Sequence, residues 1–329
     1  MTEKLDRPSY DELPVLDGTS LPTAWGQYGE SDELGAVNLL TAERVRAAVH
    51  SVVTGERFSL GLPLHLPDPP INGREAFRHK VFTTLPNITD DRLDSFYPQG
   101  SSQWDALAHF AHPAKGFYNG FTVADVLDRG KDGIHNPAMK GIVGRGVLAD
   151  VARYLDGRGT PLTPGQRAEI KAQDVLDTLA AEGAELRPGD ILCVRTGWMA
   201  YYKALDHHGR EQLAESMRAL TFASPGLAPA SDYARLIWDN GVVALAVDNT
   251  GVEPEPAPMI TQPAPAYDFD NLMHVQVLAM LGVHLGELFD FEALADACTA
   301  DGRYDFLLAS APLWVHGGVG TPPNAIAIR

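Results

Sequence analysis

The chain of 329 residues predicts an α/β fold in which short apolar strands alternate with helices. Two predicted strands in its middle, residues 191–196 and 242–247, each follow a predicted helix, and residues 191–194 and 242–247 are apolar runs. A run that is apolar on both faces is typical of a strand buried inside a sheet. Because no internal repeat, low-complexity tract or linker interrupts the alternation, we expect one α/β domain over residues 36–329. An irregular arm, rich in Pro, Gly and acidic residues, precedes it over residues 1–35.

The first elements of the domain are a helix and a strand. Residues 38–53 carry apolar side chains at helical spacing and end before Gly55, where a helix can stop. Residues 58–66 are short, apolar and loosely alternating, which favours a strand. Residues 68–74, rich in Pro, Asn and Gly, predict the loop that follows.

The middle and the end of the chain continue the pattern. Residues 174–181 predict a helix capped by Asp174, whose side-chain oxygen can accept hydrogen bonds from the amides of the first turn. A Pro-rich stretch, residues 251–266, predicts irregular structure. The same kinds of signal predict a turn at 187–190 and the end of a helix at 236–240. They also predict helices over 271–281, capped by Asp268 or Asp270, and over 289–300. Closing strands are predicted at 306–309 and 325–328.

Charge and cysteine content restrict the classes of function. With 26 Lys and Arg against 43 Asp and Glu, the formal net charge is −17, which argues against nucleic acid and anionic membrane surfaces as partners. No apolar run approaches the roughly 20 residues of a membrane helix, and the first residues lack the apolar core of a signal peptide. Cys193 and Cys298 are too few for a disulfide framework, although one disulfide is possible. We expect a cytoplasmic protein.

The densest group of polar side chains with metal-binding chemistry lies in residues 99–112. In an extended chain Gln103 and Asp105 point to the same side, and His109 can join them if the chain then turns. A carboxylate, an amide oxygen and an imidazole suit Zn²⁺ or Mn²⁺. The alternative is that Asp105 caps a helix beginning at Ala106, with His109 on its surface. P-loop, dinucleotide-binding, Gly-x-Ser-x-Gly and Cys-x-x-Cys motifs are absent from the sequence.

This segment resembles the signature of the metal-dependent cyclase and kynurenine formamidase family, His-x-Gly-Thr-His-x-Asp-x-Pro-x-His. Asp105 and His109 match the Asp and the last His of that signature. The departures are Gln99 and Gln103 for the first two His, Ser101 and Ser102 for Gly-Thr, and Leu107 for Pro. The likeness extends in order over residues 36–329, through 141–150, 189–198, 246–253, 274–291, 304–312 and the terminal Pro-Pro-Asn-Ala.

The resemblance implies a swivelling β/β/α fold with a central mixed sheet, and a metal-activated water that attacks a carbonyl. It assigns Asp105, His274 and Glu287 as metal ligands and His109 as the general base. Gln103 can bind a metal through its amide oxygen, which tilts selection from Zn²⁺ towards Mn²⁺. With two motif histidines replaced, we expect one divalent ion, Mn²⁺ or Zn²⁺.

Several residues have a structural alternative to a functional role. A lone His274 in an amphipathic helix can be an ordinary core or surface residue, Glu287 a cap, and Asp248 a turn-stabilising carboxylate. The side chains expected to bind substrate could equally pack in the core or stabilise the turn at residues 117–120; they are Trp104, His112, Tyr118 and Asn119. Arg145 and Arg195 could pair with a substrate carboxylate or make structural ion pairs.

The leading functional hypothesis is a hydrolase that opens a cyclic amide, imide or lactone, or cleaves an aryl amide. The Gln substitutions argue against kynurenine formamide as its substrate. One alternative keeps the metal but closes a ring on an aromatic or polyketide-like substrate, with loss of water. The other is a non-catalytic ligand-binding protein of the same fold. We expect a small-molecule substrate and a homodimer or homotetramer.

Overall fold

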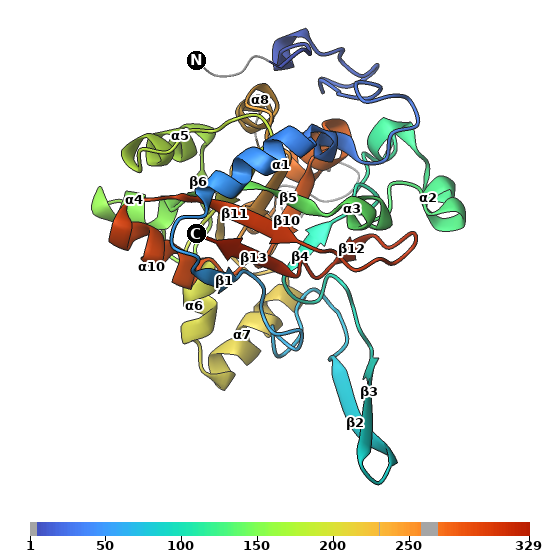
Figure 1. Ribbon diagram of the computed structural model, residues 1–329, viewed down its shortest axis with the longest axis vertical. Helices are drawn as coiled ribbons and strands as arrows, with labels where there is room; N and C mark the ends of the chain where they lie inside the picture. The colour runs from blue at the N-terminus through green and yellow to red at the C-terminus, as the bar shows by residue number, and fades with distance from the viewer. Residues whose placement is uncertain (1–4, 230, 258–268) are drawn as a thin grey trace.

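A computed structural model describes residues 5–229, 231–257 and 269–329. Its centre is a mixed sheet of nine strands (Figure 1). These strands are β1 (Arg57–Ser59), β4 (Gln103–Asp105), β5 (Ile142–Ala149), β7 (Ile191–Val194), β9 (Ala244–Val247), β10 (His284–Glu287), β11 (Asp305–Ser310), β12 (Gly320–Thr321) and β13 (Ala325–Ile328). Their order across the sheet is β1-β13-β11-β5-β7-β9-β10-β4-β12.

Four parallel strands, β5, β7, β9 and β10, form the middle of this sheet, and antiparallel strands extend it on both sides. Every residue of β7 and β9 is buried, as their continuous apolar sequences predict. The carboxyl ends of β9 and β10 meet at one edge, because the two strands run parallel in register. Strand β4 runs antiparallel to β10 and pairs Gln103 with Glu287 at that same edge.

Helices surround the sheet, and α1 crosses in front of it in the view of Figure 1. Nine are α-helices: α1 (Ala42–Ala48), α2 (Val123–Arg129), α3 (His135–Lys140), α4 (Val151–Gly157), α5 (Ala172–Ala181), α6 (Trp198–Ala204), α7 (His207–Arg218), α8 (Ser231–Asp239) and α10 (Glu292–Asp301), counted over the described residues. A π-helix, η6 (His274–Met280), is buried at every residue. The 3₁₀ turns are η1 (Tyr10–Glu12), η2 (Gly35–Leu39), η3 (Val49–Ser51), η4 (Tyr118–Gly120) and η5 (Phe269–Asn271). No helix in the described part of the chain is both long and apolar enough to cross a membrane.

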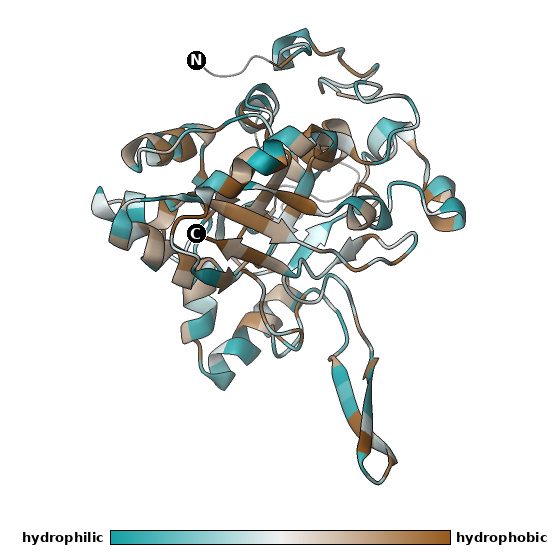
Figure 2. Cartoon of the chain, in the orientation of Figure 1, coloured by the Kyte–Doolittle hydropathy of each residue, from teal (hydrophilic) through white to brown (hydrophobic). Residues whose placement is uncertain are grey.

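Two small sheets lie outside the central one. Strands β6 (Ala168–Ile170) and β8 (Pro225–Leu227) pair in parallel. Strands β2 (Arg78–Leu85) and β3 (Ile88–Asp94) form a hairpin that projects from the body of the molecule (Figure 1). Every residue of β2 is exposed, and Figure 2 shows apolar residues towards the tip of the hairpin.

Residues 5–34 contain the 3₁₀ turn η1 and contact α8, where the Tyr10 N–H donates to Asp239 at 2.7 Å. Main-chain bonds attach this region and η2 to the end of η6: Ala24 N–H donates to the Met280 carbonyl at 2.9 Å, and Ala36 N–H to the Gly282 carbonyl at 2.8 Å. Gly35 has a φ of +59°, and a Cβ there would lie 2.0 Å from the Gly282 oxygen, so this contact requires glycine. The division of the chain at residue 35 stays a prediction.

The mixed sheet confirms the predicted fold class, and most predicted elements exist with different limits. The helix at 38–53 is shorter, with 3₁₀ turns on both sides, and the strand at 58–66 is the three-residue β1. The helix expected at 174–181 begins two residues earlier. Asp174 is therefore not its cap, and it accepts instead from the Lys171 N–H at 2.8 Å as the third helical residue.

The later elements differ in similar ways. The helix at 271–281 is π-helical over most of its length, and the helix at 289–300 begins at Glu292. Asp270 lies in the turn before η6, whereas Asp268 and part of the Pro-rich segment 251–266 lie outside the described residues. Cys193 and Cys298 are both buried free thiols. The β2–β3 hairpin is an element that the sequence analysis did not predict.

Candidate metal centre

Three side chains from separate elements converge at the edge where β9 and β10 end. Asp105 closes β4, His109 follows in the next loop, and His274 begins η6. Their ligand atoms all lie within 4.8 Å of one another. Asp105 is 0% exposed, and it does not cap a helix, because β4 ends there and no helix begins at Ala106. The extended conformation that places Gln103 and Asp105 on one side of β4 is therefore present.

The pairing of β4 with β10 adds Glu287 to this group. Glu287 lies opposite Gln103 in the antiparallel register, so both side chains lie on the same face as Asp105. The Gln103 Nε2 group donates to Glu287 Oε2 at 2.6 Å and lies 3.4 Å from Asp105 Oδ1. The amide nitrogen of Gln103 thus faces the carboxylates, and its role as a metal ligand stays a prediction.

His274 is held in place by Glu253, which follows β9. The His274 backbone N–H and ring Nδ1–H both donate to Glu253 Oε1 at 3.0 Å, and Nδ1 also lies 2.9 Å from Oε2. This bond leaves Nε2 directed at the cluster, 3.6 Å from Asp105 Oδ2 and 3.3 Å from Glu287 Oε1. A histidine whose second ring nitrogen is bonded to a carboxylate is the usual arrangement of a metal-ligating imidazole.

Close packing places Glu253 at this position. Gly226 of β8 lies so near that a Cβ there would be 2.2 Å from the backbone carbonyl carbon of Glu253. Leu227 N–H donates to the Val252 carbonyl at 2.8 Å. Glycine at position 226 therefore lets the segment after β9 approach β8 and directs Glu253 towards His274.

The donor set fits a divalent cation. Asp105 Oδ2 and Gln103 Oε1 are buried without a hydrogen-bond partner. A buried carboxylate oxygen that accepts no hydrogen bond is costly when the group is ionised, and a cation between Asp105, His274 and Glu287 would satisfy it. Carboxylate oxygens and imidazole nitrogens are ligands for Mn²⁺ and Zn²⁺ alike.

The pKa shifts in the cluster agree with a site whose carboxylates favour a nearby positive charge. Burial acts to raise the pKa of Asp105, but His109 and His274 outweigh it and hold that pKa below its usual range. Burial raises the pKa of Glu287 to about 7, an effect that the nearby Asp105 charge reinforces. For His274, burial is outweighed by Glu253, Asp105 and Glu287, which raise its pKa well above the ordinary value.

The cluster forms one wall of a cavity of about 320 Å³. Gln103, His109, His274 and Glu287 line it, together with Asn72, Arg74, Phe110, Thr250, Gly251, Glu253, Glu255, Ala257 and Leu272. His109 is partly exposed to this space, at 26% of its side chain. The cavity is therefore large enough for a small organic molecule that reaches the cluster.

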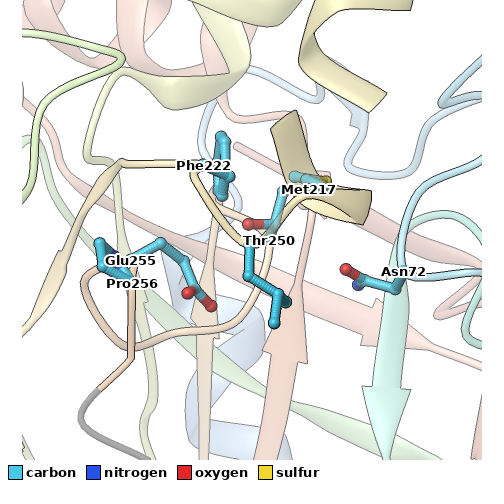
Figure 3. A pocket seen from close by; sticks show the side chains of 7 residues that line it. Asn72, Met217, Phe222, Thr250, Glu255 and Pro256 are labelled. Atoms are coloured by element: carbon cyan, nitrogen blue, oxygen red, sulfur yellow. The ribbon is translucent and has the colours of Figure 1, made fainter. Parts of the chain in front are cut away.

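A smaller side pocket, of about 70 Å³, adjoins the cavity and shares three of its lining residues. Figure 3 shows Asn72 and Glu255 directed towards each other from opposite sides, with Thr250 between them. Met217, Leu220 and Phe222 supply an apolar wall. The side pocket thus adds an apolar surface next to polar groups of the main cavity.

The four residues expected to bind substrate do not line this cavity. Trp104 is 0% exposed and packs against Phe289, with ring centroids 4.8 Å apart. His112 Nε2 donates to Asp270 at 3.0 Å, and its Nδ1 accepts from the Ala114 N–H. Tyr118 and Asn119 both bind Asp32 of the N-terminal region. The Tyr118 hydroxyl donates to the Asp32 carboxylate at 3.4 Å, and the Asn119 side-chain amide donates to the Asp32 carbonyl at 2.8 Å. Their observed contacts are those of structural residues.

Three further polar residues have structural partners. Asp248 accepts from the Thr196 N–H at 2.7 Å and the Gly197 N–H at 2.9 Å, which stabilises a turn. Arg145 pairs with Asp190 and Arg195 with Asp150, each at 2.8 Å. These residues occupy the structural alternatives considered for them from the sequence.

Glu253 and Arg74 are cavity residues that the sequence analysis did not single out. The signal for Glu253 was present, because it closes the family-like stretch 246–253 directly after a buried strand. No comparable signal marked Arg74, which lies in a loop rich in Pro, Asn and Gly.

Comparisons with known proteins agree with this architecture. The family model described as "putative cyclase" matches residues 56–254. A crystal structure described as a novel cyclase is 33% identical, with a TM-score of 0.79 over 93% of this chain and 99% of its own. Two isatin hydrolases show the same fold at lower identity. One, from Labrenzia aggregata and bound to benzyl benzoate, is 17% identical, with a TM-score of 0.54 over 83% of this chain and 93% of its own. The other, bound to the product analogue thioisatinate, is 16% identical, with a TM-score of 0.52 over 88% and 98%. A comparison with curated proteins gives no match.

Proposed function

The chain belongs to the cyclase family, and from this premise we propose that it is a metal-dependent hydrolase acting on the carbonyl of a cyclic amide, imide or lactone, or of an aryl amide. One observation carries the proposal: Asp105, His109 and His274 converge beside a cavity that both histidines line, and a buried oxygen of Asp105 accepts no hydrogen bond. The fold shared with isatin hydrolases supports hydrolysis of a cyclic amide.

Each residue of the cluster has a distinct task in this proposal. Asp105, His274 and Glu287 would hold one divalent ion, Mn²⁺ or Zn²⁺, and Glu253 keeps the His274 ring oriented. The ion, when bound, supplies Lewis acidity for a substrate carbonyl and lowers the pKa of water. His109 faces the cavity beside Asp105, where it can accept a proton from water and return it to the leaving group.

The alternatives make different demands on the same residues. Ring closure with loss of water would use the same cation and His109 to remove a proton next to the carbonyl. A non-catalytic ligand-binding protein would need neither a cation nor the cluster. The isatin hydrolases of this fold support the first proposal, and the structure described as a novel cyclase supports ring closure as its alternative.

We propose a cytoplasmic homodimer or homotetramer for this protein. The two buried free thiols are consistent with a reducing compartment. The projecting β2–β3 hairpin is consistent with association between copies of the chain.

Elemental analysis of the purified, unchelated protein tests the proposal directly. We expect about one Mn or Zn per chain in the wild type and its loss in Asp105→Ala, because that substitution removes a central carboxylate of the cluster. Asp91→Ala, on the exposed hairpin, is the control and should retain the metal. Metal-loaded wild type should then hydrolyse a member of a panel of cyclic amides and lactones that begins with isatin.

Absence of a divalent ion in the wild type would contradict the metal-dependent proposal. Equal metal content in wild type and Asp105→Ala would place the ion elsewhere in the molecule. Conversion of open-chain substrates to rings, without hydrolysis of any ring, would support the cyclase alternative instead.

A further inference from the structure

Arg74 is a cation that faces the cavity from the wall formed by the loop before the β2–β3 hairpin. It lines the cavity together with Asn72, and no other Lys or Arg does so among the described residues. Ile71, at the start of the same turn, is 3% exposed and packs in an apolar cluster with Trp198 and Leu62. Arg74 N–H donates to the Ile71 carbonyl at 3.3 Å, which closes the turn that carries Arg74. The buried Ile71 side chain attaches this turn to the body.

The guanidinium of Arg74 is partly buried and has neither an ion pair nor a hydrogen bond with any side chain that the structure describes. Burial lowers the pKa of Arg74, whereas the charges of Glu287 and Asp105 act to raise it. A guanidinium removed from water is stabilised by a planar acceptor that takes two of its N–H groups. Among the described residues, the cavity therefore contains a cationic group that donates to no acceptor.

The carboxylates of the cavity do not supply this acceptor. Glu253 bonds to His274, and Glu287 bonds to Gln103 and His274. Glu255 accepts from the Ala257 N–H at 2.8 Å. A divalent cation in the cluster would further neutralise Asp105 and Glu287, which would weaken their attraction for Arg74.

We propose that Arg74 binds a carboxylate of the substrate, so that the substrate is a small carbonyl compound carrying a carboxylate group. The carbonyl would lie at the Asp105–His109–His274 cluster and the carboxylate at Arg74, within the same cavity of about 320 Å³. The inference deepens the proposed hydrolase function and rests on it for the reaction. It rests on Arg74 and the cavity alone for the binding of an anion.

A matched pair of probes tests the inference: 4-carbamoylbenzoate, which carries an amide and a carboxylate, and its neutral analogue benzene-1,4-dicarboxamide. The proteins compared are the wild type, Arg74→Met, Arg74→Lys and the control Arg78→Met, each purified with its own metal. Arg78 lies on the exposed strand β2 and donates to Ser95, away from the cavity. Calorimetry measures the Kd of each probe, and circular dichroism and thermal unfolding verify the fold of each variant.

We expect the wild type and Arg78→Met to prefer the carboxylate probe. Arg74→Met should weaken its binding by about tenfold to hundredfold and leave the neutral probe unchanged, the range for a lost hydrogen bond between charged groups. Arg74→Lys should keep part of the preference, because it keeps the charge but loses the planar donor pair. If Arg74→Met does not fold, Arg74→Lys alone still has to reduce the preference.

Equal affinity of the wild type for both probes would overturn the inference, as would an unchanged preference in Arg74→Met. The outcome is separable from that of the proposed function. A protein without metal or hydrolytic activity that still shows the Arg74-dependent preference would contradict the function and retain the inference. A metal-loaded hydrolase without the preference for the carboxylate probe would retain the proposed function and contradict the inference about Arg74.

Discussion

Two histidines face one carboxylate in the candidate metal centre. His109 Nε2 lies 3.7 Å from Asp105 Oδ1, and His274 Nε2 lies 3.6 Å from Asp105 Oδ2. Their surroundings differ, because Glu253 binds the far nitrogen of His274, whereas His109 is open to the cavity. A bonded imidazole is suited to hold a cation, and a partly exposed one is suited to exchange protons. In the proposed function, this difference assigns His274 as the ligand and His109 as the base.

Replacement of the exposed histidine tests this division. His109→Ala should keep the metal but lower turnover by about 10²–10⁴-fold, the contribution expected of a general base. Elemental analysis and kcat on the best substrate from the panel measure the two quantities. Loss of the metal in His109→Ala would make His109 a ligand, and unchanged kcat would exclude it as the base.

Removal of the carboxylate behind His274 should act on metal affinity. We expect Glu253→Gln to weaken binding of Mn²⁺ or Zn²⁺ by about 10–100-fold, because the partner that orients the imidazole and raises its basicity loses its charge. Competition with a chelator measures the affinity. Glu255→Gln is the matched control, since Glu255 lines the cavity but does not bond to His274 in the described contacts. Equal affinities in both variants would contradict the role given to Glu253.

At the scale of elements, the site depends on where strands end and how they pair. Strand β10 and the segment after β9 contribute Glu287 and Glu253, and β4 crosses antiparallel to place Gln103 and Asp105 beside them. The π-helix η6 contributes His274 from a buried surface. Elements far apart in sequence therefore meet at one sheet edge, a common location for sites in α/β folds.

The β2–β3 hairpin, unlike the strands of the site, lies outside the central sheet. A two-stranded hairpin alone is marginally stable in water, yet this one projects away from the central sheet (Figure 1). It exposes large apolar side chains, among them Val81 at 60% and Leu85 at 58%. Its two strands also lack neighbours on their outer edges within the described structure. These features fit an arm that packs against a second copy of the chain.

Shortening of this arm tests the proposed association. Replacement of residues 79–93 by a short Gly-Ser turn should lower the mass of the assembly, to the monomer if the wild type is a dimer, because the exposed apolar contacts are removed. Sedimentation velocity measures the mass of both proteins. Metal content serves as a control for the fold, since the cluster residues lie outside the deleted segment. An unchanged assembly would exclude the hairpin as the contact.

At the scale of the whole molecule, Asp32 and Glu33 of the N-terminal region lie close to a buried aspartate of the body, Asp132. Asp132 is 0% exposed, with both carboxyl oxygens unpartnered, and its backbone N–H donates to Glu33 at 2.9 Å. Burial first, and then Glu33 and Asp32, raise the pKa of Asp132 to about 9. Its buried carboxyl therefore keeps its proton at neutral pH, where it would be ionised in the unfolded chain.

The raised pKa of Asp132 predicts a pH dependence of stability. The folded form binds the proton more tightly, so stability is fully present below the unfolded pKa of about 3.9 and is lost as the pH rises towards 9. Asp132→Asn should not lose stability in this way, because asparagine has no carboxyl group to ionise. Its free energy of unfolding should exceed that of the wild type increasingly between pH 5 and 8, by up to about 1.4 kcal/mol per pH unit.

Thermal unfolding across this pH range measures the difference. Asparagine tolerates the φ of +56° at this position, so the substitution does not strain the backbone. Asp128→Asn, an exposed position on α2, is the control and should follow the wild type. A difference in Tm between Asp132→Asn and the wild type that is independent of pH would contradict the assignment.

Local sequence patterns determined much of this protein. The buried strands β7 and β9 follow from apolar runs, since a strand covered on both faces needs apolar residues throughout. The motif in residues 99–112, with Asp105 and His109, and the later stretch with His274 and Glu287 indicated the cyclase family. The comparisons confirm that family. The extended conformation at Gln103–Asp105 was one of the two alternatives that the sequence left open.

Only the tertiary structure decided which side chains face the cavity. Trp104 lies within the motif and Tyr118 shortly after it, yet both are buried in the core. Arg74 and Glu253 come from distant segments and line the cavity. Strand register, the docking of η6 and the course of the loop before the hairpin set these positions. Such contacts depend on pairing between residues far apart in the chain, and a local pattern in one sequence carries little information about that pairing.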